Sequence, residues 1–251
     1  YIHIADFHCD KNHLIYSNKT VTDLDDGDAG ESTHDTADAT NHHCQVVATM
    51  AAGDGTGNGS GSGENLISGV AQDADLILSS IPKYSGYSFD DWARDLTHAM
   101  QTPAVASNQS WGYTSETVAG IGDCAVGDLN CNFNTTEFQN LINAYGGNTT
   151  NELLAFLGAG TTAASTDAEG WITTLNLFQD VGVIVVAAGN SIYESDASMP
   201  AGLPEFYPDL KEAWLVVGNW DFRGSSLDNA VESDFVNQGN ICGSTKEYCV
   251  I

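Results

Sequence analysis

A few polar and reactive side chains follow the apolar stretches of this sequence, at points where a folded chain could use them for chemistry. Asp6 follows the first apolar stretch, His42 opens a stretch with helical spacing, and Asn190 follows Gly189 after a long apolar stretch. The tripeptide Ser110-Trp111-Gly112 follows a shorter one. Side chains of these types transfer protons and stabilise negative charge, as acid–base catalysis requires. Each alone also fits a turn or a helix cap, so their meaning depends on the elements that position them.

Stretches that suit strands alternate along the chain with stretches that suit helices. We predict strands at residues 1–5, 74–81, 104–107, 183–187 and 213–217. We predict helices at residues 42–52, 90–101, 137–145, 151–157 and 169–181. Strands that are apolar on both faces and alternate with helices indicate an α/β fold, a doubly wound and mainly parallel sheet with helices on both faces. No repeat or linker interrupts this pattern, so we expect residues 1–251 to form one domain.

The first predicted helix, at residues 42–52, has an apolar face. Val46, Val47 and Met50 share that face at helical spacing. In open α/β sheets, functional sites gather at the carboxyl ends of the strands. Asp6 and Asn190 each follow a predicted strand, so both belong to that edge of the sheet.

The charge of the chain is strongly negative. Seven Lys and Arg residues oppose 34 Asp and Glu residues, which gives a formal net charge of -27. Phosphate groups and anionic membrane surfaces are bound by clustered Lys and Arg, so we expect neither nucleic acid nor an anionic membrane as a partner. No apolar stretch is long enough to span a bilayer, so we also expect no membrane insertion by this segment.

The six cysteines suggest disulfides and an oxidising compartment. Cys124 and Cys131 are seven positions apart, and so are Cys242 and Cys249, while the tighter paired spacing typical of zinc sites does not occur. We therefore expect two short disulfide loops. Cys9 and Cys44 could pair with each other or remain free thiols.

Several motifs in the same order resemble those of the subtilisin-like serine proteases, the subtilases. Tyr1-Ile-His-Ile-Ala-Asp6 resembles the first strand of that family, which ends in the catalytic aspartate. The stretch 41–51 resembles the family's G-H-G-T-H-V-A-G-T-I-A, and placing His42 on the catalytic histidine also aligns Val46, Thr49 and Ala51. The stretch 68–76 resembles G-V-A-P-x-A-x-L. The segment at 182–190, G-V-I-V-V-A-A-G-N, is the most specific of these matches.

The downstream sequence is similar to the protease passengers of bacterial autotransporters. In those proteins P-A-x-x-P, a V-G strand and an R-C-G…W-C segment follow in that order. Here Pro200-Ala-Gly-Leu-Pro204 is followed by Val217-Gly218 and then by Cys242-Gly243 and Tyr248-Cys249. This similarity implies an extracellular protein or one on the bacterial cell surface.

The resemblance implies a serine endopeptidase with an Asp–His–Ser triad acting on polypeptide substrates. His42 would be the base that activates the serine, and Asp6 would hold its imidazole and fix its tautomer. Asn190 would donate its side-chain amide to the oxyanion. Two short segments would flank the substrate pocket, and their residues are Ser110, Trp111, Gly112, Ala187, Ala188 and Gly189. Trp111 fits a pocket wall and a core residue equally well.

The pattern departs from the family in three places. No G-T-S-M-A segment with the nucleophile is present, and Gly243-Ser-Thr245 lies inside a predicted disulfide loop. We therefore expect the peptidase domain to be cut before its serine and this fragment alone to be inactive. Bulky residues replace small ones at Phe7-His8 and at His43. A Cys9–Cys44 disulfide would tie the first strand to the helix that carries the base.

Other interpretations remain open. The chain could be a protease-like domain without catalysis that binds peptides or protein partners. An unrelated nucleotide-binding or flavodoxin-like domain would need a glycine loop after the first strand, where the sequence has Phe7-His-Cys-Asp10. The reaction requires no cofactor, but structural calcium is common in the family. Asp23, Asp25, Asp26 and Asp28 offer oxygen ligands, although a solvated acidic loop explains them better.

Overall fold

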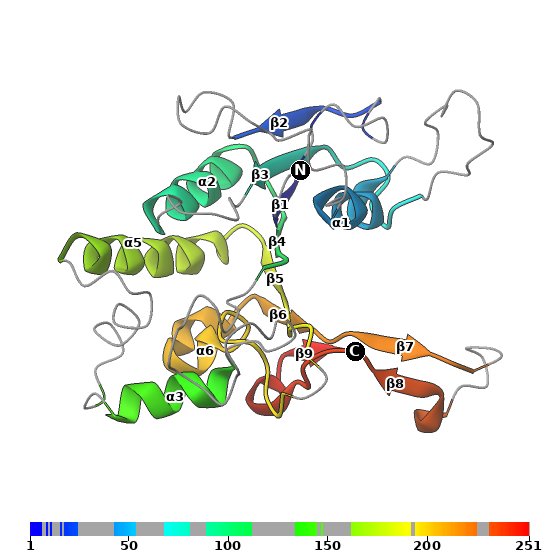
Figure 1. Ribbon diagram of the computed structural model, residues 1–251. Helices are drawn as coiled ribbons and strands as arrows, with labels where there is room; N and C mark the ends of the chain where they lie inside the picture. The colour runs from blue at the N-terminus through cyan, green and yellow to red at the C-terminus, as the bar shows by residue number, and fades with distance from the viewer. Residues whose placement is uncertain are drawn as a thin grey trace, which may run out of the picture. The chain divides into compact units, whose positions relative to one another are not determined.

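The computed structural model of the chain describes residues 1–6, 9, 11, 16, 18–24, 43–53, 68–80, 89–111, 134–144, 147, 162–191, 194–224 and 231–250. Its strands follow the hydrogen-bonded order β2-β3-β1-β4-β5-β6-β9, and β7 pairs with β8 separately (Figure 1). The pairings of β1 with β3 and β4, of β2 with β3, and of β6 with β9 are parallel. This arrangement confirms the predicted α/β fold with a mainly parallel sheet.

The chain divides into two compact units, which we call the first unit and the second unit. The first unit comprises residues 1–111 and 171–184, and the second comprises residues 112–170 and 185–251. The first unit contains β1 (Ile2–Asp6), β2 (Val21–Asp23), α1 (His43–Ala52), β3 (Leu76–Ser80), α2 (Phe89–Gln101) and β4 (Ala106–Gln109). α5 (Thr162–Phe178) and β5 (Val183–Ala187) run from one unit into the other.

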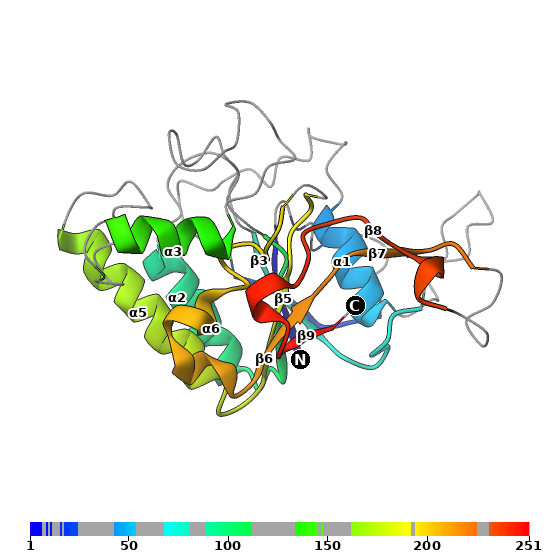
Figure 2. The same ribbon diagram turned by 90° about the horizontal axis from the view of Figure 1, so that it is seen from below.

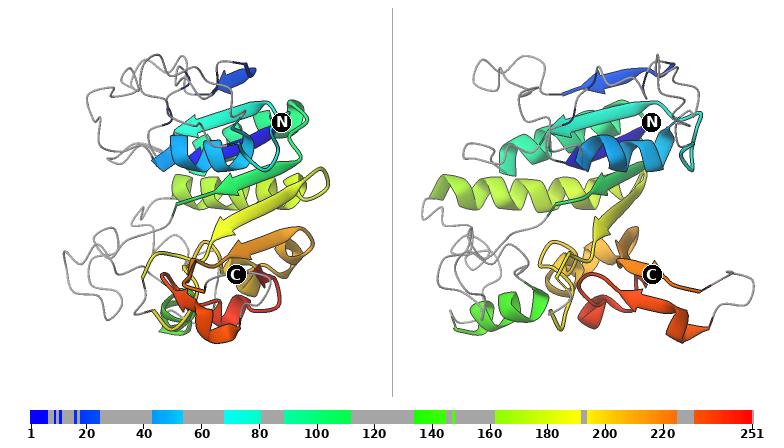
Figure 3. Two further views of the ribbon diagram at one scale, coloured as in Figure 1. Left: turned by 90° about the vertical axis from the view of Figure 1, so that its right-hand side faces the viewer. Right: turned by 45° about the vertical axis from the view of Figure 1, so that its right-hand side comes forward.

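The second unit combines short strands and helices. Among its described residues are the helices and strands α3 (Thr135–Ala144), α6 (Leu203–Phe206), β6 (Trp214–Val217), β7 (Trp220–Phe222), β8 (Phe235–Asn237) and β9 (Cys249–Val250). Single-turn 3-10 helices lie at Pro208–Lys211, Glu232–Asp234 and Gly243–Thr245. Antiparallel β7 and β8 run side by side (Figure 3). The prediction of a single domain stays a prediction.

β1 is the inner strand that positions the candidate site in the first unit. It lies between β3 and β4, and Ile4 is paired with Leu78 on one side and with Asn108 on the other. α1 lies on one face of these strands and α2 on the opposite face (Figures 1 and 2). Because β1 is covered on both faces, its residues from His3 to Asp6 are buried regardless of polarity.

Local signals explain where two of the helices begin. α3 starts with a capping box: Asn134 Oδ1 accepts from the backbone N–H of Glu137, and Glu137 Oε2 accepts from the N–H of Asn134, both at 2.9 Å. This box places the helix start two residues before the predicted one. α2 carries Asp90 and Asp91 in its first turn, where negative side chains stabilise the positive end of the helix dipole.

The predicted elements agree with the structure to different degrees. The strand at 183–187 is confirmed with the same bounds, and those predicted at 1–5, 74–81, 104–107 and 213–217 are confirmed within a few residues. The helix predicted at 169–181 instead covers Thr162–Phe178. Beyond its end the chain turns toward β5: the N–H of Gly182 donates to the carbonyl of Phe178 at 2.9 Å, and a Cβ at Gly182 would lie 2.8 Å from the carbonyl of Val105. The predicted helix at 151–157 lies outside the described residues.

Candidate active site

A carboxylate and an imidazole meet where β1 ends and α1 begins. Nδ1 of His43, the first residue of α1, donates to Asp6, the last residue of β1, with distances of 2.8 Å to Oδ1 and 2.9 Å to Oδ2. Asp6 is fully buried, whereas half of the His43 side chain is exposed. The strand thus supplies a fixed acceptor, and the helix presents the far side of the imidazole to solvent.

The electrostatics of this pair favour a charged imidazole. The hydrogen bond to Asp6 raises the pKa of His43 above its ordinary 6.5, partial burial opposes that rise, and the charge of Asp6 adds to it. Because Nδ1 carries the proton that faces Asp6, Nε2 of the neutral ring is the nitrogen that can take up a proton from a neighbouring group. The pair therefore has the geometry of a general base with its orienting carboxylate.

The histidine held by Asp6 is not the one that the motif alignment selected. The alignment selected His42, which lies outside the described residues, whereas the structure places the adjacent His43 on Asp6. We therefore replace His42 with His43 as the candidate base. The alignment relied on matches at Val46, Thr49 and Ala51, which do not report how the helix is rotated.

The face that α1 buries is not centred on its apolar residues. Val46 and Met50 are 59% and 54% exposed, whereas Val47 is partly buried against the core. The buried residues of the helix are Cys44, Gln45, Ala48 and Ala52. Small residues at positions 44, 48 and 52 let the helix approach the sheet closely. This small-residue face, directly after His43, is the signal in the sequence that could have identified the histidine that bonds Asp6.

A disulfide lies beside the Asp6–His43 pair. Cys9, three residues after Asp6, is bonded to Cys44, the residue after His43, and both cysteines are fully buried. They belong to an apolar cluster with Ile4, Ala48 and Leu78. The second disulfide, Cys242–Cys249, is also present, and the described residues contain no free cysteine. The predicted pair Cys124 and Cys131 lies outside the described residues.

The first predicted pocket segment is partly a core segment. Trp111 is 7% exposed and donates through Nε1 to Gln109 Oε1 at 2.7 Å. Its ring lies 4.3 Å from that of Trp92 and 5.9 Å from that of Trp171, measured between centroids. These contacts make Trp111 a core residue of the first unit. Ser110 is half-buried and donates its backbone N–H to the carbonyl of Ala5, and Gly112 lies outside the described residues.

The second predicted pocket segment follows β5 in the second unit. The carbonyl of Ala187 accepts from Ser198 Oγ, and that of Ala188 accepts from the backbone N–H of Ser198. Gly189 has a φ of 121°, a backbone conformation that residues other than glycine rarely adopt. Asn190, directly after it, is exposed. The amide of Asn190 is thus presented to solvent from a segment whose carbonyl groups are hydrogen-bonded within the protein.

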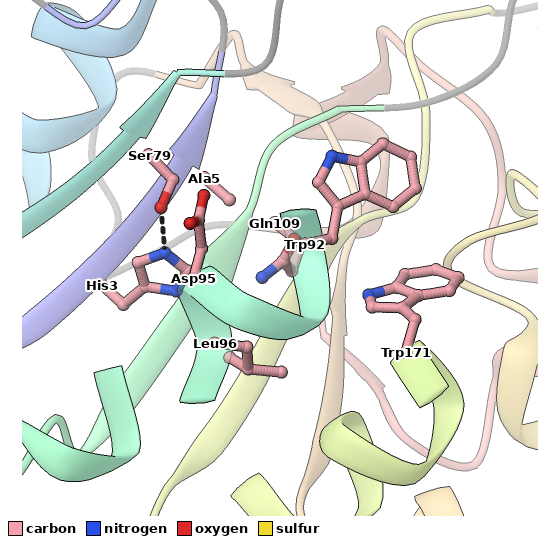
Figure 4. Close-up of a pocket in the computed structure, with 8 residues that line it drawn as sticks. All are labelled: His3, Ala5, Ser79, Trp92, Asp95, Leu96, Gln109 and Trp171. Atoms are coloured by element: carbon pink, nitrogen blue, oxygen red, sulfur yellow. Dashed lines mark hydrogen bonds between the residues drawn. The ribbon is translucent and has the colours of Figure 1, made fainter. Parts of the chain in front are cut away.

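Sequence reasoning missed a buried histidine in the inner strand β1. His3 hydrogen-bonds Ser107 Oγ through Nδ1 at 2.9 Å and Ser79 Oγ through Nε2 at 2.8 Å (Figure 4). Burial, with a smaller effect from His98, lowers the pKa of His3 to about 4. The adjoining cavity, which Asp95 and Trp171 also line, is about 10 Å³, the room of one water molecule. It is too small to hold a substrate side chain.

Most of the candidate calcium ligands lie outside the described residues. They contain no group of three or more His, Cys, Asp or Glu residues that could hold an ion. Asp23 is nearly fully buried and lies 3.7 Å from Lys11 Nζ, while Asp25, Asp26 and Asp28 fall outside the described ranges. Within those ranges no helix has the length and apolar character needed to cross a membrane.

The parallel α/β fold and the Asp–His pair define a protein equipped for acid–base chemistry. The model of the subtilase family, peptidase S8, matches residues 1–250, and the chain belongs to this protease family. A comparison with curated protein sequences found no match.

Solved structures of two maturation proteases have the same fold. The prenylagaramide maturation protease PagA is 16% identical, with a TM-score of 0.52 over 99% of this chain and 61% of its own. The self-cleaved protease domain of PatA is 18% identical, with a TM-score of 0.51 over 99% of this chain and 64% of its own. The chain thus spans less than two thirds of the length of either structure.

Proposed function

We propose that the complete protein is a serine endopeptidase in which Asp6 and His43 are two members of an Asp–His–Ser triad. The observation that carries this proposal is the hydrogen bond from His43 Nδ1 to the fully buried carboxylate of Asp6. A buried carboxylate in this position fixes the tautomer of the imidazole and stabilises the imidazolium that forms when the base accepts a proton. Membership of the subtilase family supports the same reaction.

The chemistry of each step follows from these groups. Nε2 of His43 removes the proton of the serine hydroxyl as the oxygen attacks the carbonyl carbon of the peptide bond. The imidazolium then donates that proton to the leaving amine, and a water molecule repeats the sequence to release the acyl group. The side-chain amide of Asn190 donates to the oxyanion. Ser110, Gly112 and residues 187–189 flank the substrate, and no cofactor takes part.

We further propose that none of these 251 residues is the nucleophilic serine. No G-T-S-M-A segment occurs in them, and the serine in Gly243-Ser-Thr245 already has a structural role. Ser244 donates both its backbone N–H, at 2.7 Å, and its hydroxyl, at 2.9 Å, to Asp196 Oδ1. We therefore propose that these 251 residues alone do not hydrolyse peptides.

The site of action that we propose is extracellular or on the bacterial cell surface, as in the autotransporter passengers that the downstream motifs resemble. Two disulfides, Cys9–Cys44 and Cys242–Cys249, favour an oxidising compartment. The net charge of -27 suits a protein that stays dispersed in salty surroundings. The substrates on this proposal are polypeptides.

The test is covalent labelling of the complete gene product with a serine-directed fluorophosphonate, together with hydrolysis of an unstructured protein substrate. We expect stoichiometric labelling, loss of hydrolysis after labelling, and loss of both in His43→Ala. Heat-denatured protein is the control for nonspecific labelling. A folded complete protein that is neither labelled nor proteolytic would overturn the proposal and favour a protease-like domain that binds peptides without cleaving them.

A further inference from the structure

The candidate oxyanion donor sits on a backbone whose two flanking peptide groups are held in place. Gly189 before it adopts a φ of 121°, and Ser191 after it is 1% exposed, whereas Asn190 itself is exposed. Because the side chain of Asn190 is exposed, its backbone is held by hydrogen bonds to the two neighbouring residues. In the second unit, both of these contacts come from one residue, Asn240.

Asn240 is fully buried and brackets Asn190 from both sides. Its backbone N–H donates to the carbonyl of Gly189 at 3.1 Å, and its side-chain Oδ1 accepts from the N–H of Ser191 at 2.9 Å. Its Nδ2 donates to the backbone carbonyl of Asp196 at 2.9 Å. The side-chain amide thus uses both its donor and its acceptor within the protein.

The chain around Asn240 lies in close backbone contact with this segment. A Cβ at Gly239 would collide with the carbonyl oxygen of Gly189, and one at Gly243 would collide with the carboxylate of Asp196. Gly243 also has a positive φ of 49°. Asp196 itself is buried and accepts from Thr136 Oγ1 at 2.7 Å. Close backbone contact therefore sets the distance between Asn240 and the segment that it brackets.

We propose that Asn240 is a positioning residue that orients the side chain of Asn190 for oxyanion stabilisation. This inference rests on the proposed function, because the two contacts of Asn240, with Gly189 and Ser191, matter for catalysis only if Asn190 is the oxyanion donor. We call these two contacts the bracket. A donor stabilises a transition state best when it already points at the developing charge, since no reorganisation is then needed during the reaction. A residue that clamps both neighbouring peptides supplies this orientation while leaving the donor free to face the substrate.

The test is a double-mutant cycle in the complete protein with Asn240→Ala and Asn190→Ala. We expect Asn190→Ala to lower kcat by roughly 10²- to 10³-fold. Asn240→Ala should lower kcat by about 10-fold or more, with KM nearly unchanged, because misplacing a catalytic group reduces the rate rather than the binding of substrate. The double variant should be no slower than Asn190→Ala, since the bracket acts through Asn190.

Thr136→Ala is the matched control. It removes one side-chain hydrogen bond to Asp196 and leaves the contacts of Asn240 with residues 189 and 191 in place. We expect it to lower stability without changing kcat. A wild-type kcat in Asn240→Ala would overturn the proposal. It would also be overturned if Asn240→Ala lowered kcat by the same factor in the wild-type protein and in the Asn190→Ala variant. Full activity in Asn190→Ala would instead refute the oxyanion assignment on which the proposal rests.

Amide hydrogen exchange tests the bracket without relying on activity, and it also covers the case in which Asn240→Ala fails to fold. We expect the Ser191 N–H of the unmodified protein to exchange as slowly as the N–H of Val216, a core strand residue bonded to Tyr248. Exchange of the Ser191 N–H at the rate of an exposed loop would show that the bracket does not hold, and would overturn the proposal.

Discussion

At the scale of single residues, two histidines of the first unit are held by partners of opposite character. His43 donates to the carboxylate of Asp6, which stabilises a positive ring. His3 lies between the hydroxyl groups of Ser79 and Ser107 in the buried sheet, where a positive ring has no counter-charge among its hydrogen-bond partners. Their environments therefore move the two pKa values in opposite directions.

The first prediction concerns His43. Its pKa lies above 6.5 in the folded protein, and Asp6→Asn should lower it, because the variant removes the charge and weakens the hydrogen bond. Since the raised folded pKa favours the protonated form, the stabilisation by Asp6 is complete below pH 6.5 and is lost as the pH rises through the folded pKa. An NMR titration of the ring C–H protons measures both values. Equal values in wild type and Asp6→Asn would contradict the assignment.

The second prediction concerns His3. Its folded pKa of about 4 lies below the ordinary 6.5, so the unfolded chain binds a proton more readily than the folded one between these values. Stability should therefore fall as the pH drops from 6.5 to 4, by about 3 kcal/mol relative to a variant without the imidazole. Urea unfolding of wild type and His3→Gln at several pH values measures this difference. Parallel pH dependences of the two proteins would contradict it.

At the scale of elements, α1 shows how far the sequence alone could lead. The sequence predicts a helix at 42–52, and the structure confirms it at His43–Ala52. Which face it buries does not follow from the sequence, because apolar residues occur all around it and periodicity does not select one face. Burial of Cys44 and Ala48 instead of Val46 reflects the close approach of α1 to β1, a tertiary constraint that local spacing does not contain.

The position of the Asp6 carboxylate is easier to predict than that of the histidine that bonds it. Asp6 ends a strand that is buried on both faces, and such apolar strands are recognised from composition alone. Which of two adjacent histidines reaches it depends on helix rotation, since neighbouring residues of a helix point about 100° apart. The burial of His3 could not be predicted either. In a strand with one polar face, alternation shows which residues point inward, but β1 is buried on both faces and lacks that alternation.

The third prediction concerns the link between β1 and α1. The Cys9–Cys44 disulfide closes a loop of 35 residues and joins the segments that carry Asp6 and His43. Replacing both cysteines by alanine should lower the free energy of unfolding by about 4 kcal/mol and move the pKa of His43 toward 6.5, because the pair is no longer held together. Chemical unfolding and the histidine titration measure the two effects.

The matched control replaces Cys242 and Cys249 by alanine. This disulfide spans only seven residues, so its loss should cost about 2 kcal/mol. It lies in the second unit, and the pKa of His43 should stay unchanged. An unchanged pKa in the Cys9/Cys44 variant, or the same shift in both variants, would refute a specific role of the first disulfide in holding the pair.

At the scale of the whole molecule, the α/β class followed from the alternation of strands and helices, whereas the division into two units did not. The chain passes between the units after Trp111, inside α5 and inside β5, and the last two crossings interrupt a regular element rather than a linker. Asp6 and His43 belong to the first unit, and Asn190 and Asn240 belong to the second.

The fourth prediction concerns charge. An excess of 27 negative charges repels itself in the compact state, and salt shortens the range of that repulsion. We expect the thermal midpoint to rise as sodium chloride increases from about 10 mM to about 0.2 M, where the Debye length falls below about 10 Å. Differential scanning calorimetry at constant pH measures it, with sucrose of matched osmolality as the uncharged control. A midpoint independent of salt would contradict the prediction.

The most direct test of the central claim is kcat/KM of the complete protein after His43→Ala, compared with His42→Ala. If Asp6 and His43 form the acid–base pair of a serine protease, His43→Ala lowers kcat/KM by roughly 10⁴-fold or more. His42→Ala, a change of the same size one residue away, leaves it close to the wild-type value. Full activity in His43→Ala, or a collapse of activity in His42→Ala alone, would contradict the account.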